Sequence, residues 1–109
     1  MTLPSEVHVQ LARMEEARRE TQRQLDQIDR QIIRRMTALI PRLQPKRIGY
    51  RHGKPPDGQA FLERYRSHLA ALTAERQPEI DALSWRLAHQ DQAIAVLRVR
   101  HGLVLPRVA

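Results

Sequence analysis

The 109-residue chain has no cysteine and only four aromatic residues. The absence of cysteine excludes a disulfide scaffold, thiol catalysis and any zinc site built on thiolates. No stretch comes near the ~18 uncharged apolar residues that a membrane span requires. Residues 1–6 also lack the basic-then-apolar order of a signal peptide. We therefore expect a single small cytoplasmic domain that makes no membrane contact.

Motifs for metals, nucleotides and nucleophiles are missing as well. None of the five histidines stands four residues from another histidine or from a carboxylate, so the pattern predicts no metal site. The run from Gly49 to Pro55 has three residues between its glycines instead of four, and no Ser or Thr to hold magnesium, which excludes a phosphate-binding loop. No nucleophile motif is present. We expect no cofactor.

Acidic residues are absent from residues 30–56, which hold eight basic ones. These are Arg30, Arg34, Arg35, Arg42, Lys46, Arg47, Arg51 and Lys54. The whole chain has 19 Lys+Arg and 12 Asp+Glu, a net charge of +7, so the excess lies in this segment and in the basic tail 98–109. Such a charge indicates an anionic partner: nucleic acid, an acidic protein or a small polyanion. Arg42, Arg47, Arg51 and Lys54 are the candidate anion-binding residues, with Tyr50 placed to stack on a base. The alternative is a solvated, charge-rich loop.

Apolar residues recur at steps of three or four between Ser5 and Ile40, a stretch without proline or glycine. They are Leu11, Met14, Ala17, Thr21, Leu25, Ile28, Ile32, Met36 and Leu39. This spacing predicts one long helix over residues 5–40 with a narrow apolar seam. The helix would be about 54 Å long at ~1.5 Å per residue. We expect Pro41 to end it.

Residues 41–58 form a predicted basic loop, rich in proline and glycine, with Asp57 as the N-cap of the next helix. A short helix over 59–77 would turn inward Leu62, Tyr65, Leu69 and Leu72. The spacing then slips, and Pro78 followed by acids is typical of a first helical turn. We therefore expect a third helix over 78–101. Its seam residues are Ile80, Leu83, Leu87, Ile94 and Leu97. One kinked, continuous helix is the alternative.

Gly102 is suited to end the third helix, which leaves residues 102–109 as a tail. A small hairpin over Val96–Val108 is the alternative. Trp85 falls beside the seam, and we expect it to pack in the core rather than against the loop or a dimer partner. Three narrow-seamed helices do not close a core alone. We therefore expect an all-α fold, an intertwined homodimeric bundle in which the long helices pair across a two-fold axis. A monomeric hairpin is the alternative.

Two arginines fall on or beside the apolar seam of the long helix. Arg18 and Arg35 are seventeen residues apart, and strict heptads would place both there. An arginine near an apolar seam needs an anion to neutralise it. The spacing therefore indicates a carboxylate-binding pocket between helices. The alternative is that the stems lie along the seam and the charged heads reach water.

Parts of the sequence resemble the all-helical chorismate mutases. The run from Leu25 to Ile33, Leu-Asp-Gln-Ile-Asp-Arg-Gln-Ile-Ile, is similar to the alternating Ile/Leu-Asp pairs of that family's first helix. Arg34-Arg35-Met36, with Lys46 eleven residues after Arg35, is similar to its active-site arginine and lysine spacing. Pro56-Asp57 and Leu62-Glu63-Arg64 resemble its second helix. The resemblance covers residues 18–95.

The resemblance implies a dimeric enzyme that binds chorismate or a related small dicarboxylate and lets it rearrange without cofactor or nucleophile. Arg35 would bind a substrate carboxylate and Lys46 the ether oxygen or a carboxylate. Arg18 would reach into the partner's pocket, although an alignment on the Ile-Asp pairs puts Gln22 at that position. Gln90 or Gln92 would supply the late polar residue of the third helix. The family's second-helix Arg-Glu pair has no match after Asp57.

The sequence thus leaves two main hypotheses and a third. The first is a chorismate mutase-like isomerase or lyase that uses Arg35, Lys46, Arg18 and Gln90. The second is a non-enzymatic dimeric helical module that binds nucleic acid or an acidic protein through residues 30–56. The third is a coiled-coil adaptor of a secretion or mobile-element system.

Overall fold

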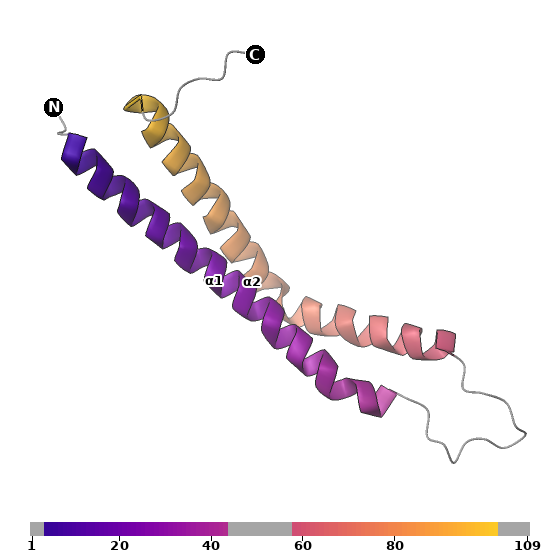
Figure 1. Cartoon of the computed structure of the whole chain (residues 1–109). Helices are drawn as coiled ribbons and strands as arrows, with labels where there is room; N and C mark the ends of the chain where they lie inside the picture. The colour runs from indigo at the N-terminus through magenta and orange to yellow at the C-terminus, as the bar shows by residue number, and fades with distance from the viewer. Residues whose placement is uncertain (1–3, 44–57, 103–109) are drawn as a thin grey trace, which may run out of the picture. The chain divides into compact units, whose positions relative to one another are not determined.

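Two long helices make up the computed structural model, which describes residues 4–43 and 58–102 (Figure 1). Helix α1 runs from Pro4 to Leu43 and helix α2 from Gly58 to Arg100. No strand occurs among the described residues. The prediction of an all-α fold is confirmed. Neither helix has an apolar stretch of the length and hydropathy that crossing a membrane would take.

The chain divides into two compact units, each built from one segment of either helix. Unit 1 comprises residues 1–26 and 79–109, and unit 2 comprises residues 27–78. In unit 1, Glu15 pairs with Arg98 and Arg18 with Asp91. Their order shows that the two segments are antiparallel.

Unit 2 repeats the antiparallel arrangement. Gln31 contacts Arg76, and Leu43, at the end of α1, contacts Arg64. A later residue of α1 therefore again meets an earlier residue of α2. Each unit is thus a pair of antiparallel helical segments.

The prediction of two separate helices on either side of Pro78 is wrong, because α2 continues through this residue. Proline has no N–H to donate to the carbonyl of Ala74, which costs about 3 kcal/mol inside a helix. Apolar residues continue on both sides of the proline, with Leu72 before it and Ile80 after it. Pro78 is also the last residue of unit 2, so the missing hydrogen bond falls at a unit boundary. The alternative of one continuous helix holds.

The end of the long first helix differs slightly from its prediction. Helix α1 includes Pro41 and extends to Leu43, because a proline near the end of a helix interrupts only one hydrogen bond. The first three residues of the predicted basic loop therefore belong to α1, and Gly58 belongs to α2. The rest of the predicted loop lies outside the described residues.

Helix α2 ends where the sequence predicts. Gly102 has a φ of 66°, the left-handed conformation that glycine adopts without strain. Its N–H donates to the carbonyl of Val99 at 3.2 Å, and that of His101 donates to Leu97 at 3.1 Å. Because residues 96–100 are helical, the alternative hairpin beginning at Val96 is wrong.

The core is a narrow seam between the two helices. In unit 1 the buried apolar residues are Val7, Ile94 and Leu97. In unit 2 they are Ile28, Ile32, Met36, Leu43 and Leu72. Thr21 is buried as well, and its hydroxyl donates to the carbonyl of Ala17 at 3.2 Å. Eight of the nine predicted seam residues of the long helix are buried or half-buried.

Four residues expected to face inward are exposed, and the first is Ala17 on α1. Leu62 and Leu69 flank the seam, because Phe61 and Tyr65 occupy the positions that face α1 before Leu72. Trp85 has 66% of its surface exposed, so the expectation that it packs in the core is wrong. It lies two residues after Leu83, which puts it on the side of α2 away from the seam.

Candidate anion-binding surface

The net charge of the chain belongs to one unit. Unit 2 contains eleven Lys+Arg and four Asp+Glu, whereas unit 1 contains eight of each. The whole charge of +7 is therefore in unit 2, although the two units have nearly equal lengths. An anionic partner would be attracted to this unit.

The predicted site residue Arg35 lies in unit 2 and is exposed. Its guanidinium donates to the carboxylate of Glu75 on α2 at 3.2 Å. Both side chains are more than half exposed, so the pair is worth at most about 1 kcal/mol. Arg35 is thus partly neutralised by a carboxylate of its own chain, across the packing of the two helices.

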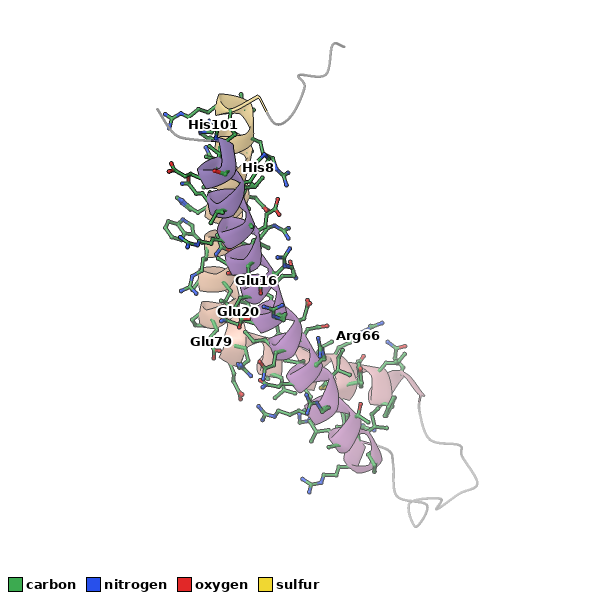
Figure 2. All side chains as sticks on the ribbon, turned by 60° about the vertical axis from the view of Figure 1, so that its left-hand side comes forward. His8, Glu16, Glu20, Arg66, Glu79 and His101 are labelled. Atoms are coloured by element: carbon green, nitrogen blue, oxygen red, sulfur yellow. The ribbon has the colours of Figure 1, made fainter. Side chains whose placement is uncertain are left out.

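Four other arginines of unit 2 are exposed and have neither a hydrogen bond nor an ion pair within the described residues. They are Arg30, Arg34, Arg42 and Arg66. Arg30 and Arg34 are one turn apart on the side of α1 away from the seam. Arg42, a predicted anion-binding residue, is in the last turn of α1. Arg66 lies on the first part of α2 (Figure 2). These guanidinium groups are available to an anion from outside.

Arg64 fixes the end of α1 that leads towards the predicted basic loop. Its Nε and one terminal nitrogen donate to the carbonyl of Leu43 at 3.2 and 2.8 Å. The last carbonyls of a helix have no intrahelical partner, and a cation beside them is favourable for the helix dipole. The contact therefore joins the C-terminal end of α1 to the beginning of α2.

A different arginine occupies the apolar seam of unit 2. Arg76 is half-buried between the seam positions of Leu72 and Ile80, and its guanidinium donates to Gln31 Oε1 at 2.7 Å. The sequence hypothesis places Arg18 and Arg35 at or beside the seam and expects an anion as their partner, whereas Arg76 donates to a neutral amide. The eight-residue step from Leu72 to Ile80 indicates this position, since residue 76 lies one helical turn from each of them.

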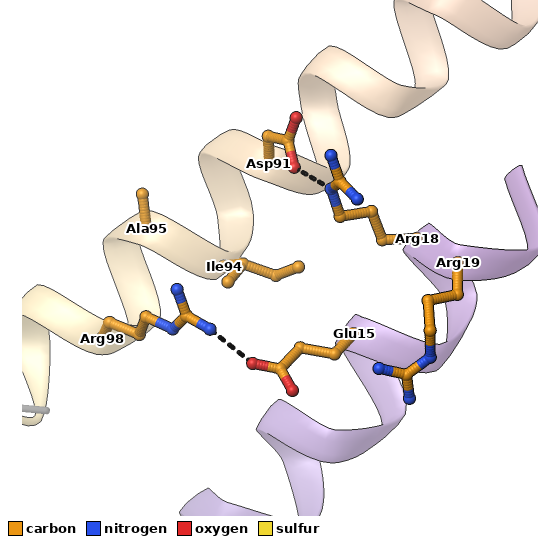
Figure 3. A pocket seen from close by; sticks show the side chains of 7 residues that line it. All are labelled: Glu15, Arg18, Arg19, Asp91, Ile94, Ala95 and Arg98. Atoms are coloured by element: carbon orange, nitrogen blue, oxygen red, sulfur yellow. Dashed lines mark hydrogen bonds and ion pairs between the residues drawn. The ribbon is translucent and has the colours of Figure 1, made fainter. Parts of the chain in front are cut away.

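Arg18, the other predicted seam arginine, lies in unit 1. Its Nε donates to the carboxylate of Asp91. It lines a groove of about 330 Å³ (Figure 3). The other lining residues are Glu15, Arg19, Asp91, Ile94, Ala95 and Arg98. Arg98 pairs with Glu15 in the same groove, so two carboxylates already neutralise two of its three arginines.

Gln90, the predicted polar residue of the third helix, lies in the seam of unit 1. Its Oε1 is buried and has no hydrogen-bond partner in the part of the chain that the structure describes. A buried carbonyl oxygen without a donor is unfavourable by about 1–3 kcal/mol.

The charges on the outward side of α1 in unit 1 compensate one another. Arg23 forms ion pairs with Glu16 and Glu20, both at 2.8 Å, and Arg19 forms one with Glu16. Figure 2 shows the two glutamates on α1. The hydrogen bond from Arg23 lowers the pKa of Glu16 and also the pKa of Glu20. The same bonds raise the pKa of Arg23. This side of unit 1 therefore presents paired charges to an external anion.

The remaining predicted site residues, Lys46, Arg47, Arg51 and Lys54, lie outside the described residues. Among residues 4–43 and 58–102, no three His, Asp or Glu side chains are grouped in a way that could hold a metal ion. No family model, characterised protein or solved structure matches the chain. The function therefore has to be inferred from the residues themselves.

Proposed function

We propose that the chain is a non-enzymatic helical module that binds nucleic acid through unit 2. The observation that supports this proposal most is the location of the net charge. The net charge of unit 2 is +7, equal to that of the whole chain. Four of its arginines have no partner among the described residues, namely Arg30, Arg34, Arg42 and Arg66. Unpaired arginines on an exposed helix are suited to phosphate, which a guanidinium binds through two parallel hydrogen bonds.

The spacing of Arg30 and Arg34 is compatible with a phosphate polymer. One helical turn separates them by ~6 Å along the axis. Two steps along one strand of DNA cover ~7 Å. A strand therefore offers phosphates at close to the interval that separates the two residues along α1. Basic residues of the predicted loop, namely Arg47, Arg51 and Lys54, would extend the contact, with Tyr50 stacking on a base.

Binding of this kind is sequence-independent and sensitive to salt. We expect the full chain to bind a labelled 30-nucleotide single strand or duplex. Its affinity should fall by about 10³ or more between 50 and 200 mM salt if six or more phosphates are contacted. Fluorescence anisotropy at four salt concentrations measures this slope. Binding that is absent at 50 mM salt, or unchanged by salt, would overturn the proposal.

A competition experiment separates nucleic acid from an acidic protein. Unlabelled polyglutamate of matched charge is titrated against the bound oligonucleotide. We expect it to compete much less well than unlabelled DNA, because polyglutamate has no bases on which Tyr50 could stack. Polyglutamate that competes as well as DNA, charge for charge, would instead support an acidic protein partner.

The chorismate mutase-like activity stays a prediction. Arg18 and Arg35 would bind substrate carboxylates in that hypothesis, yet each has a carboxylate of the same chain beside it. Conversion of chorismate to prephenate by the purified chain, abolished by Arg35→Ala, would establish the enzyme and contradict the proposal of a non-enzymatic module. Turnover at the uncatalysed rate would leave nucleic-acid binding as the function.

A further inference from the structure

Helix α2 has a second apolar stripe in unit 1, on the side opposite to the seam. Trp85, Val96 and Val99 are 66%, 54% and 71% exposed. These three residues belong to a set of six that recur along α2 at alternating steps of three and four. The stripe consists of Ala82, Trp85, His89, Gln92, Val96 and Val99, and we call it the outer stripe. Each member follows a seam residue by two positions, about 200° around the helix.

No charged residue occupies the outer stripe. The charged residues between positions 82 and 99 are Arg86, Asp91 and Arg98, and all three lie beside it. On α1, by contrast, the outward side of unit 1 carries the ion pairs of Glu16, Glu20 and Arg23. The stripe thus exposes three large apolar side chains on an uncharged helix face, with His89 and Gln92 between Trp85 and Val96. An exposed apolar surface that is bordered by charges marks an interaction site.

Two side chains of the outer stripe contact each other. The rings of Trp85 and His89 are in contact, with their centroids 3.9 Å apart. Large side chains that are held before binding lose less conformational entropy on association. The stripe is therefore suited to a partner that packs along the helix.

We propose that a second copy of this chain docks on the outer stripe, with the two α2 helices parallel around a two-fold axis. Heptad spacing is the pattern by which helices pair side by side, and a two-fold contact brings the same residues together from both copies. An identical helix matches the stripe in length and register. Gln92 would meet Gln92 of the second copy, and two amides can donate to and accept from each other.

Flanking charges decide the orientation. In heptad terms, Ala82, His89 and Val96 take position a of the dimer core, and Trp85, Gln92 and Val99 take position d. Asp81 then falls at position g and Arg86 at position e of the following heptad, and g and e are the positions that flank the core. A parallel pair brings Asp81, which also has an interaction within its own chain, towards Arg86 of the second copy, twice over. An antiparallel pair would bring Arg86 towards Arg100 of the second copy, which repels. Charge complementarity thus favours the parallel dimer.

Sedimentation equilibrium of the full chain tests the dimer. A contact of about 18 residues per helix is small, so we expect a dissociation constant in the micromolar range and a dimer mass at roughly 500 µM. Val96→Asp should give the mass of one chain at the same concentration. Val9→Asp is the matched control, because Val9 is equally exposed, at 51%, but lies on α1. It should leave the dimer intact.

A single introduced cysteine tests the orientation without a large change in the surface. The natural chain has no cysteine, so Val96→Cys has one thiol. In a glutathione buffer we expect Val96→Cys to form a disulfide-linked dimer, because a parallel pair places residue 96 of both copies side by side. Ser84→Cys, beside the stripe, should remain a monomer without a cross-link. A chain that is monomeric at the highest concentration would overturn the proposal. So would a dimer that survives Val96→Asp, or a Val96→Cys variant that does not cross-link.

Discussion

Unit 1 and unit 2 are built alike, since in each a segment of α1 packs against an antiparallel segment of α2 along a narrow apolar seam. They differ in charge. Unit 1 has eight basic and eight acidic residues, and many of them form ion pairs along or between its helical segments. Unit 2 has eleven basic and four acidic residues, and several of its arginines have no partner in the described region. The net charge of a small chain therefore indicates a binding surface only when the charges are located on the fold.

The units also differ in the polar residue that α2 contributes to each seam. In unit 1 it is Gln90, whose oxygen is buried without a partner in the part of the chain that is described. In unit 2 it is Arg76, whose guanidinium donates to Gln31. Four predictions, in order of decreasing effect, test the packing and the charges of the two units.

Loss of a core side chain should have the largest effect. Met36 is 2% exposed in the seam of unit 2, so Met36→Ala should lower the free energy of unfolding by about 2–4 kcal/mol. Ile33→Ala, three residues earlier and 55% exposed, should change it by less than about 0.5 kcal/mol. Urea unfolding followed by circular dichroism measures both. Equal effects of the two variants would contradict the burial of Met36 between the two helices.

The seam arginine should matter more than the exposed one. Arg76→Ala leaves Gln31 without its charged donor and removes half-buried packing, so we expect a loss of about 1.5–3 kcal/mol. Arg35→Ala breaks only an exposed pair with Glu75 and should cost less than about 1 kcal/mol. The same urea unfolding ranks the two. A larger effect from Arg35 would contradict the placement of Arg76 in the seam.

Replacing Gln90 should stabilise unit 1 slightly. Gln90→Leu removes a buried oxygen that has no partner in the described residues, and it extends the apolar seam between Leu87 and Ile94. We expect a gain of about 0.5–1 kcal/mol in the free energy of unfolding. Thermal unfolding of the variant beside the natural chain measures the sign. A clear destabilisation would show that the side chain has a polar role that the helix packing does not reveal.

Acid should remove the contribution of the carboxylates on the outward side of α1 in unit 1. Arg23 lowers the pKa of Glu16 and Glu20 below the ordinary value of 4.5. A lowered folded-state pKa contributes stability above 4.5, and this is lost as the pH falls through the folded-state values. Because both side chains are more than half exposed, the effect should be the smallest of the four. Glu16→Gln/Glu20→Gln should flatten the fall in melting temperature below pH 4.5, and an unchanged acid profile would contradict these pairs.

Much of the fold follows from the spacing of apolar residues. The seam from Ile28 to Met36, and the one from Ile80 to Leu97, could be predicted because both keep steps of three, four or seven. The continuity of α2 could not, since Pro78 and its neighbouring acids are equally typical of a helix start. Of the residues predicted inward before Pro78, Tyr65 is half-buried and Leu72 is buried, whereas Leu62 and Leu69 are exposed. Phe61 and Arg76, which the predicted spacing does not include, are half-buried.

The candidate site was only partly predictable. A cluster of basic residues is visible in the sequence, but the partner of each arginine depends on which residue of the other helix lies opposite. Arg18 and Arg35 were singled out by heptad position, and only the antiparallel packing brings Asp91 and Glu75 to them. The outer stripe was missed because Trp85 was assigned to the core.

Two double variants that remove the same charge from different units test most directly whether nucleic acid binds to unit 2. Arg30→Gln/Arg34→Gln takes two unpaired arginines from unit 2. Arg13→Gln/Arg100→Gln takes two from unit 1 that also have no partner among the described residues. We measure the slope of log Kd for a labelled oligonucleotide against log salt. The unit 2 variant should lower the slope by about 1.4–1.8, which corresponds to two phosphate contacts, and the unit 1 variant should leave it unchanged. Equal changes in the two slopes would contradict the claim that binding belongs to unit 2.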